Sequence, residues 1–343
     1  MTLVVVDADV LGRRRTGDES YVRNLLRTLP GPAAEAGLGL AAVTRHPELV
    51  PAGVEAVSLP ARSQELRMAW SLPRTLHRLG ADLVHTQYAL PLRCPCPAVV
   101  TVHDLSFAED DPSLMGRRDR WTFRRVVPRA VRAAARVLTV SERTKRDLLG
   151  RYGLPPDRVV VTPNGVDPAF GPEGACNTLL QAPYALAVGA IQPRKNQLAA
   201  LAAAQEAGLE LVVAGPVKDE RVASELRDAG ARLLGYVPTE RLAELYRGAA
   251  CLVQASRHEG FGLPVVEAMA SGTPVVVVPD PALVEVAGDA AVVAPEAHLA
   301  DGIRRALDER DRLRDLGLAR ARSFTWEAAA ETTVRAYLEA LGR

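Results

Sequence analysis

The sequence predicts an α/β protein made of two doubly wound domains, each built around a parallel β-sheet. Short runs of β-branched residues alternate along the chain with stretches of helical period, which is typical of β-α-β units. The alternation stops at Pro168–Pro183, a segment rich in proline, glycine and small residues, and then starts again. The length of 343 residues suits two domains of ordinary size.

The first domain is expected to cover residues 1–168. Its predicted strands are Val4–Asp7, Leu38–Val43, Ala81–His85, Ala98–His103, Arg136–Val140 and Val159–Val161. Its predicted helices are Asp18–Leu29, Ser63–Leu79, Ser113–Ala135 and Ser141–Tyr152.

The second domain is expected to cover residues 169–325, and an amphipathic helix over Thr325–Leu341 follows it. Its predicted strands are Tyr184–Val188, Leu209–Val213, Ala231–Leu234, Ala250–Gln254, Pro274–Val278 and Ala290–Val293. Its predicted helices begin near Lys195, Asp219, Thr239, Pro264, Pro281 and Glu296. Because such sheets bind ligands beyond the carboxyl ends of their strands, the cleft between the domains is the expected site.

Composition narrows the class of protein. The formal net charge of +1 points to no particular partner, and the arginines lack the aromatic stacking motif that would indicate nucleic-acid binding. No apolar run approaches the roughly 20 residues of a membrane span, and the amino terminus does not resemble a signal peptide. Cys94 and Cys96 stand too close for an easy disulfide and lack the second pair of a zinc site. We therefore expect a cytoplasmic protein with reduced cysteines.

Two glutamates flank a glycine-rich turn in the segment Glu259-Gly-Phe-Gly-Leu-Pro-Val-Val-Glu267. Pro264 suits the first position of a helix, so the backbone N–H groups near Gly262 and Leu263 would form an anion site at a helix start. Glu267, predicted in the first turn, is placed to accept two hydrogen bonds from a ribose diol. Glu259 can reach hydroxyl groups beyond the phosphates. The alternative is an ordinary helix start, with Glu267 compensating the dipole and Glu259 solvated.

Two further motifs lie at predicted strand ends. Arg194-Lys195 follows the first strand of the second domain, at the same sheet edge as Glu259, where two fixed cations can bind a diphosphate. A solvated basic pair is the alternative, although cations at a helix start are disfavoured unless an anion joins them. His103 ends a strand of the first domain and is expected to face the cleft. A strand-end histidine satisfied by hydrogen bonds is the alternative for His103.

These motifs together resemble family 4 of the retaining glycosyltransferases, also called glycosyl transferases group 1. The resemblance also rests on His103-Asp104, Ser141-Glu-Arg-Thr-Lys-Arg-Asp and Pro163-Asn-Gly-Val-Asp, and it covers nearly the whole chain. It implies the GT-B fold, in which two Rossmann-like domains face a central cleft. It also implies that the last helix, starting at Thr325-Trp326, crosses back, so that residues 326–343 join the first domain.

The resemblance assigns roles to single residues. The residues that it implies for donor binding are Gly189, Arg194, Lys195, Tyr236, Val237, Glu259, Gly260, Phe261, Gly262, Leu263 and Glu267. Those that it implies for catalysis are His103, Arg194, Lys195 and Glu259. Glu267 would bind the ribose, the basic pair the diphosphate, and Glu259 the sugar, while Tyr236 and Val237 would lie beside the base. His103 would approach the reacting carbon.

The implied reaction is a retaining transfer of a hexosyl group from a nucleoside-diphosphate sugar to a hydroxyl of a glycan, glycolipid or small molecule. Mannose is the first choice of sugar by family frequency. Because Arg194 and Lys195 would supply the positive charge, no metal and no cofactor are expected, and we interpret the D-x-D sequence Asp7-Ala8-Asp9 as structural. A nucleotide-sugar epimerase of the same fold and an inactive sugar-nucleotide-binding protein remain alternatives. A dehydrogenase is excluded, because Gly37-Leu-Gly-Leu-Ala-Ala precedes a strand instead of following one.

Two basic segments differ from the expected pattern. The loop with Gly12, Thr16 and Gly17, implied to touch the donor phosphates or the acceptor, carries three arginines and is followed by Asp18 and Glu19. These acids would repel an anion docked on the helix end, whereas the arginines can hold one beside it. Residues 113–151 contain twelve Arg or Lys and three acids, a net +9, with Trp121 among them. This tract predicts either peripheral docking on the anionic inner face of a membrane or an ordinary solvated helix face.

Overall fold

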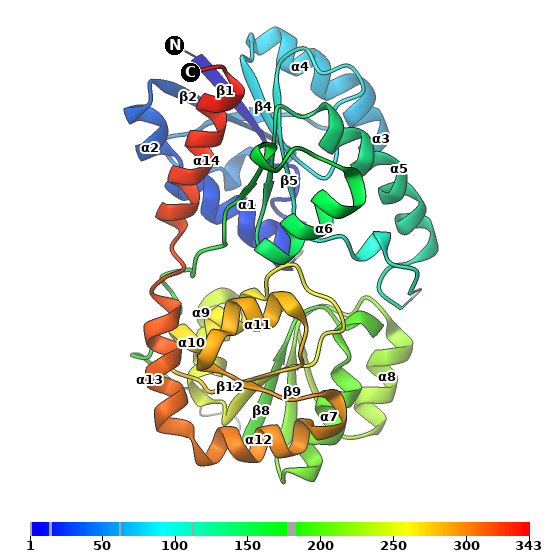
Figure 1. Cartoon of the computed structure of the whole chain (residues 1–343), viewed down its shortest axis with the longest axis vertical. Coiled ribbons are helices and arrows are strands. Elements are labelled where there is room, and N and C mark those ends of the chain that lie inside the picture. The colour runs from blue at the N-terminus through cyan, green and yellow to red at the C-terminus, as the bar shows by residue number, and fades with distance from the viewer. Residues whose placement is uncertain (1, 14–15, 62, 112, 177–182) are drawn as a thin grey trace. The chain divides into compact units, whose positions relative to one another are not determined.

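The computed structural model describes residues 2–13, 16–61, 63–111, 113–176 and 183–343, and the chain divides into two compact units (Figure 1). The first unit consists of Met1–Asp110, Gly116–Gly165 and Trp326–Arg343, and the second of Asp111–Met115 and Val166–Thr325. The main division thus falls at Gly165, a few residues before the predicted one. The described residues of Pro168–Pro183 belong to the second unit, and residues 177–182 lie outside the described residues.

The first unit is built on a parallel sheet with the strand order β3-β2-β1-β4-β5-β6-β7. Its strands are β1 (Thr2–Asp7), β2 (Leu38–Thr44), β3 (Glu55–Ser58), β4 (Leu83–Gln87), β5 (Ala98–Val102), β6 (Arg136–Thr139) and β7 (Val159–Val161). Its helices are α1 (Thr16–Thr28), α2 (Pro30–Glu35), α3 (Gln64–Leu66), α4 (Leu72–Leu79), α5 (Arg117–Ala133), α6 (Glu142–Tyr152) and α14 (Trp326–Ala340). A π-helical turn, η2 (Arg67–Ser71), joins α3 to α4.

The sequence did not predict two elements of the first unit, β3 and α2. β3 is a short edge strand in which only Val57 is buried, so it lacks an apolar run. α2 carries two prolines and a glycine in six residues, a composition that favours turns. Neither element alters the order of the strands that carry the predicted site.

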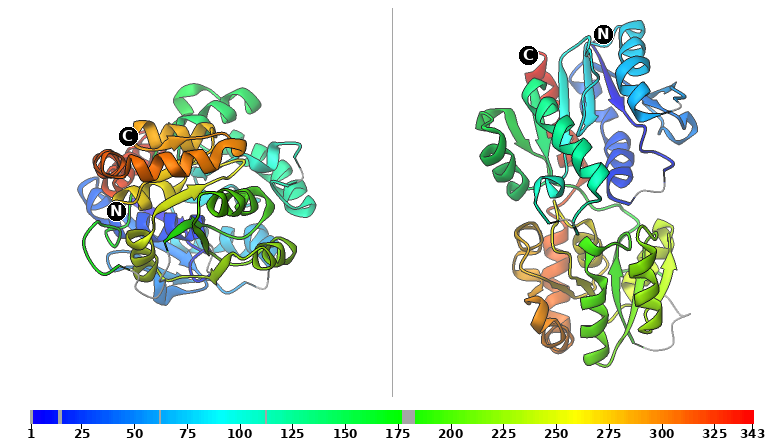
Figure 2. Two further views of the ribbon diagram at one scale, coloured as in Figure 1. Left: turned by 90° about the horizontal axis from the view of Figure 1, so that it is seen from below. Right: turned by 90° about the vertical axis from the view of Figure 1, so that its right-hand side faces the viewer.

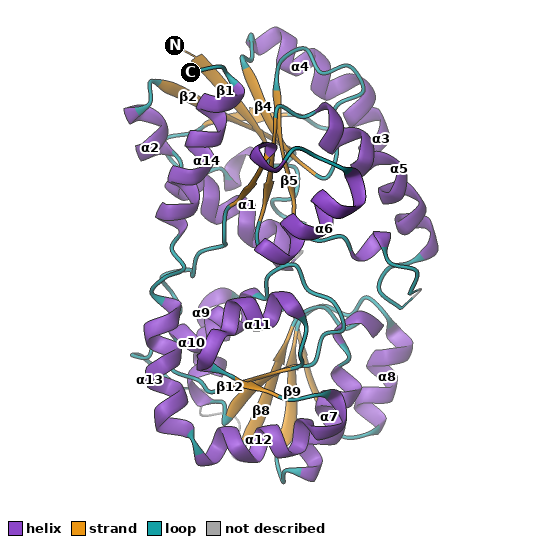
Figure 3. Cartoon of the chain, viewed as in Figure 1, coloured by secondary structure: helices purple, strands orange, loops and turns teal. Residues whose placement is uncertain are grey.

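Helices cover both faces of this sheet (Figure 3). Successive residues of a strand point to opposite faces. Accordingly, Val4 and Val6 belong to a core shared with α1, α2 and α14, whereas Val5 belongs to a second core shared with α4. α14 contributes the buried side chains of Trp326 and Tyr337 to the first of these cores. The predicted return of the last helix to the first domain is therefore confirmed.

The second unit is built on a parallel sheet with the strand order β10-β9-β8-β11-β12-β13. Figure 2 shows the ribbon from two further directions. Its strands are β8 (Tyr184–Val188), β9 (Glu210–Ala214), β10 (Arg232–Gly235), β11 (Cys251–Gln254), β12 (Val275–Val277) and β13 (Val292–Val293). Its helices are α7 (Gln197–Glu206), α8 (Glu220–Asp228), α9 (Thr239–Gly248), α10 (Leu263–Ala270), α11 (Pro281–Ala287), α12 (Leu299–Asp308) and α13 (Arg310–Ala321). The single helix predicted from Glu296 is wrong: the chain breaks at Glu309 between α12 and α13.

The order of the strands determines where the second sheet can bind a ligand. β8 lies between β9 on one side and β11 on the other, so the direction of winding reverses at β8. Open α/β sheets bind ligands beyond the carboxyl ends of the strands at such a reversal. The loops that follow β8 and β11 are the ones that carry Arg194-Lys195 and Glu259.

Candidate active site

The loops after β8 and β11 bring three predicted site residues together. Lys195 Nζ donates a hydrogen bond of 2.5 Å to Glu259 Oε1. Arg194 Nη1 lies 3.8 Å from Glu259 Oε2 and donates to the backbone carbonyl of His258 at 2.9 Å. Gln254, the last residue of β11, donates to the same Glu259 Oε1 at 2.8 Å. The two cations and the carboxylate therefore form one charged cluster at the reversal of the sheet.

The carboxyl group of Glu259 is buried and nevertheless ionised. Burial by itself would raise its pKa, but the charges of Lys195 and Arg194 outweigh burial and hold the pKa at about 2. A carboxylate with so low a pKa cannot donate a proton near neutral pH. Glu259 can instead orient Lys195 and accept hydrogen bonds from hydroxyl groups.

The basic pair lies in a tight turn ahead of α7. Arg194 and Lys195 are part of the 3-10 turn Pro193–Lys195, and α7 begins at Gln197, so the helix does not start at Lys195 as predicted. Gly189 precedes this turn with a φ of 137°, a conformation that favours glycine. A Cβ at Gly189 would lie 3.4 Å from Cε of Lys195, so the glycine leaves room for the lysine side chain.

The glycine-rich turn after β11 leads directly into α10. Gly262 caps the helix with a φ of 103°, a conformation that favours glycine, and a Cβ there would lie 2.7 Å from Cδ2 of Leu283. Leu263 and not Pro264 is the first helical residue. Phe261 is buried and packs edge-on against Phe324 at 5.5 Å between ring centroids, so its side chain supports the turn from inside. The backbone N–H groups at this helix start remain the predicted anion site.

Glu267 has different surroundings from Glu259. Because α10 begins at Leu263, Glu267 is the fifth helical residue, and its predicted place in the first turn is wrong. Its Oε2 accepts a hydrogen bond of 2.8 Å from the buried hydroxyl of Tyr246. Burial raises the pKa of Glu267 to about 7, with Asp167 acting in the same direction and the Tyr246 bond acting against it. The carboxyl group is therefore poised between its two protonation states near neutral pH.

The residues predicted beside the base follow β10. Tyr236 and Val237 come directly after the carboxyl end of this edge strand, and the Tyr236 side chain is exposed. They lie at the same sheet edge as the basic pair but beyond β9 in the strand order. Within the described part of the chain, no hydrogen bond or ion pair joins either residue to the charged cluster.

His103 follows β5 in the first unit and is held among aromatic rings. The ring of Tyr21 meets it edge-on at 4.7 Å, and the ring of Tyr88 lies at 5.6 Å. His103 Nε2 lies 3.4 Å from Oε1 of Gln87, the last residue of β4. Burial lowers the pKa of His103, against the opposing charges of Asp18 and Asp104, so the imidazole is neutral at pH 7.

A buried chain of polar groups behind His103 was missed by the sequence prediction. The hydroxyl of Tyr21 and Nε2 of His85 both bond to Oγ1 of Thr101, at 3.0 and 2.7 Å. Nδ1 of His85 bonds to the hydroxyl of Tyr337 in α14 at 2.7 Å. Burial lowers the pKa of His85 to about 3. The only signal in the sequence is a pair of polar residues within otherwise apolar strands.

The loop between β1 and α1 is described only in part. Gly12 has a φ of 77°, and its N–H donates to Oε1 of Glu19 at 3.0 Å. Thr16 and Gly17 form the first positions of α1, while residues 14 and 15 and the side chain of Thr16 lie outside the described residues. Among the described residues, no group of three His, Cys, Asp or Glu side chains is arranged to hold a metal ion.

The fold defines the class of protein. Among solved structures, sucrose-phosphate synthase from Thermosynechococcus elongatus shares the fold with a TM-score of 0.79, covering 98% of this chain and 98% of that one at 20% identity. Two doubly wound parallel sheets, with a final helix that returns to the first, are the architecture of GT-B glycosyltransferases, so the predicted fold is confirmed.

The chain belongs to the family 4 glycosyltransferases, as the sequence predicts. Residues 16–170 match the family model Glycosyltransferase Family 4, and residues 177–322 match Glycosyl transferases group 1. O-antigen chain mannosyltransferase B of Escherichia coli is 32% identical over 79% of this chain and 77% of its own length. A D-inositol 3-phosphate glycosyltransferase of Actinosynnema mirum is 30% identical over 98% of this chain and 91% of its own length. The protein is therefore a glycosyltransferase.

Proposed function

We propose that the protein transfers a hexosyl group, with mannose as first choice, from a nucleoside-diphosphate sugar to a hydroxyl of a glycan, glycolipid or small-molecule acceptor. We further propose that the transfer retains the anomeric configuration and needs no metal ion. The observation that carries the proposal is the cluster of Arg194, Lys195 and Glu259 at the reversal of the second sheet. The mannosyl group is supported by the name of the Escherichia coli relative.

The proposed chemistry follows from the charges of this cluster. Breaking the bond between the anomeric carbon and the diphosphate builds positive charge on the sugar and negative charge on the leaving phosphate. Arg194 and Lys195 are fixed cations that would stabilise the leaving group, and one such contact is typically worth about 3–4 kcal/mol. An oxygen of the leaving phosphate would then take the proton of the acceptor hydroxyl.

The other site residues would bind and orient the donor. Ionised Glu259 would hold Lys195 and accept a hydrogen bond from a sugar hydroxyl, and its low pKa argues against a role as proton donor. Glu267 would bind the ribose diol once it has lost its proton. The N–H groups near Gly262 and Leu263 would bind the diphosphate. His103 would contact the sugar as a neutral imidazole.

A thermal-shift panel of nucleoside diphosphates and their sugars tests the donor. A ligand at about 100 times its dissociation constant stabilises a protein by about 2.7 kcal/mol, so one base should give the largest rise in melting temperature. The same panel on Lys195→Ala should lose most of that rise. On Arg312→Ala it should not, because Arg312 lies on α13, is 58% exposed and pairs with Glu309. A panel with no shift would reject the proposed donor class.

Product analysis separates the transferase from its alternatives. With the best donor and a panel of hydroxyl acceptors, NMR of the product should show the donor's anomeric configuration retained. Conversion of the sugar nucleotide without any acceptor would indicate an epimerase, and binding without turnover an inactive binding protein. Inversion at the anomeric carbon would refute the retaining route alone.

We also propose that residues 113–151 dock on an anionic membrane surface. In α5, Val127 and Val131 are buried, whereas Trp121 is 57% exposed. The guanidinium of Arg125 lies 3.8 Å from the centroid of the Trp121 ring. An exposed aromatic ring among arginines is the combination that binds the interface of an anionic bilayer. No helix in the described ranges is long and apolar enough to span a membrane, so the proposed contact is peripheral.

A further inference from the structure

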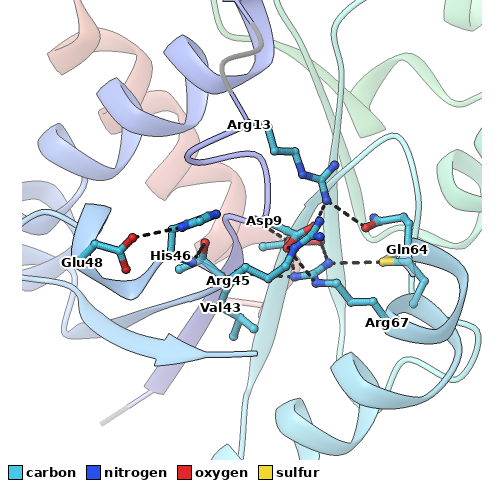
Figure 4. Close-up of polar contacts among 11 residues, drawn as sticks. Asp9, Arg13, Val43, Arg45, His46, Glu48, Gln64 and Arg67 are labelled. Atoms are coloured by element: carbon cyan, nitrogen blue, oxygen red, sulfur yellow. Dashed lines mark hydrogen bonds and ion pairs between the residues drawn. The ribbon is translucent and has the colours of Figure 1, made fainter. Parts of the chain in front are cut away.

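A second cluster of charged side chains lies at the carboxyl ends of β1 and β2, in the first unit (Figure 4). Asp9 follows β1 and Arg45 follows β2, and these two strands are neighbours in the sheet. Arg13 comes from the loop after β1, and Arg67 opens the π-helical turn η2. Figure 4 shows the three guanidinium groups converging on Asp9. The cluster has no part in the chemistry proposed for the second unit.

The inner part of the cluster neutralises the carboxylates that the fold buries. Arg67 is fully buried, and its Nη1 and Nη2 donate to the two carboxylate oxygens of Asp7 at 2.8 and 2.6 Å. Arg45 Nε and Nη2 donate to the two oxygens of Asp9, both at 2.8 Å. Each buried carboxylate thus has a guanidinium bound through two hydrogen bonds, which is the arrangement that makes a buried charge tolerable. Two arginines already balance two aspartates.

Arg13 adds a third positive charge to this set of two arginines and two aspartates. Its Nη2 donates to Oδ2 of Asp9, the oxygen that Arg45 Nη2 already uses, and to Oε1 of Gln64 at 3.3 Å. Arg67 Nε also lies 3.5 Å from Asp9 Oδ1. Three guanidinium groups therefore surround one carboxylate, and the described members of the cluster carry three positive and two negative charges. Such crowding of like charges is relieved when an anion joins them.

The excess charge is open to solvent at the edge where this type of sheet binds ligands. The side chain of Arg13 is 22% exposed and that of Arg45 37% exposed, whereas that of Arg67 is 0% exposed. A guanidinium has five N–H donors, and Nη1 of Arg45 makes no hydrogen bond within the described residues. β1 lies between β2 and β4, so the cluster is at the reversal of the first sheet, the counterpart of the site in the second.

We propose that Arg13 and Arg45 form an oxyanion subsite that binds a phosphate or carboxylate group of the acceptor. Asp9 and Arg67 are positioning residues that aim the two exposed guanidinium groups. The planar fork of arginine fits the paired oxygens of such a group. The assignment to the acceptor rests on the proposed function. The helix-start acid Glu19 does not oppose it directly, because its carboxylate already accepts bonds from the Gly12 N–H and from Arg23.

Arginine labelling tests the subsite without any turnover. The full chain is treated with phenylglyoxal, without donor or acceptor, in inorganic phosphate or in chloride at equal ionic strength, and labelling rates of single arginines are read by mass spectrometry. Labelling of Arg13 and Arg45 should slow as phosphate rises, by about tenfold at roughly ten times the dissociation constant. Arg136 is the matched control: it is 24% exposed, is paired with Glu339 at 2.8 Å, and begins β6 at the opposite edge of the same sheet.

Two more anions identify the source of the oxyanion. Protection by dimethyl phosphate would indicate the phosphodiester of a lipid-linked acceptor, protection by inorganic phosphate alone a phosphate monoester, and protection by acetate a carboxylate. Arg45→Gln should abolish the protection of Arg13, because the subsite needs both guanidinium groups. Equal labelling rates in all three anions and chloride, or protection confined to Arg194, would overturn the proposal. Since no donor enters the measurement, its failure would leave the proposed transferase standing, and failure of the donor panel would leave the subsite standing.

Discussion

Raising the pH from about 6 to about 8 should strengthen donor binding roughly tenfold if Glu267 has its proposed role, because the carboxyl group must lose its proton before it can accept two hydrogen bonds from a ribose. Burial lifts the pKa of this carboxyl group to about 7, although the hydroxyl of Tyr246 donates to it at 2.8 Å. One pH unit below that pKa, only about a tenth of the protein carries the ionised, binding-competent carboxylate. The apparent dissociation constant rises by the inverse of that fraction.

Titration calorimetry across this pH range measures the effect. The donor sugar nucleotide is the ligand of choice, because the terminal phosphate of a free nucleoside diphosphate itself titrates near pH 6. Repeating the titration in buffers of different ionisation enthalpy counts the proton released on binding, which should approach one at the acid end. A flat affinity across the range in the wild-type protein would refute the reasoning.

Two variants assign the pH dependence to Glu267. Glu267→Gln cannot ionise, so its donor affinity should be weak and independent of pH. Tyr246→Phe removes the hydrogen bond that lowers the pKa of Glu267, so the rise in affinity should move to higher pH. If Glu267→Gln kept the wild-type pH profile, another group would be responsible.

The same pKa shift makes the free protein less stable at high pH. The pKa of Glu267 is about 7 in the folded protein and 4.5 in the unfolded chain, so the folded protein holds the proton more tightly. The stability that this contributes is complete below pH 4.5 and is lost as the pH rises to about 7. The rise from 4.5 to about 7 corresponds to at most about 3–4 kcal/mol, at about 1.4 kcal/mol per pKa unit. Glu267→Gln should therefore melt at a higher temperature than the wild-type protein at pH 8, with no gain at pH 4.

Three further predictions concern other parts of the molecule. Lys195→Ala should lower turnover by about 10²–10³-fold, the usual cost of one lost charge-stabilising donor, and wild-type turnover in this variant would contradict its role. Tyr21→Phe keeps the ring against His103 but loses the bond to Thr101, so the free energy of unfolding should fall by about 1 kcal/mol with turnover nearly unchanged; a large loss of turnover would show that the hydroxyl takes part in the reaction. Trp121→Ala should reduce co-sedimentation with anionic vesicles at low salt, and an absence of binding by the wild-type protein would end the membrane proposal.

The sequence by itself determined the local structure and the motifs at the strand ends. Alternation of β-branched runs with helical periods predicts most of the strands and helices, because side-chain periodicity is a property of each segment alone. Where that signal is weak, in the edge strand β3 and the proline-rich α2, the prediction failed. The Arg194-Lys195 pair and Glu259 could be predicted because each lies in a loop after the carboxyl end of a strand, where open α/β sheets bind ligands, and Glu267 because it belongs to the same motif as Glu259.

Only the tertiary structure decided the charge states and partners of those residues. Two glutamates eight positions apart look alike in the sequence, yet one has a pKa of about 2 beside Lys195 and the other a pKa of about 7 beside Tyr246. The partners of His85 and Asp9 likewise come from distant segments, with 252 positions separating His85 from Tyr337. Burial and through-space charge set a pKa, and both depend on residues that meet only when the chain has folded.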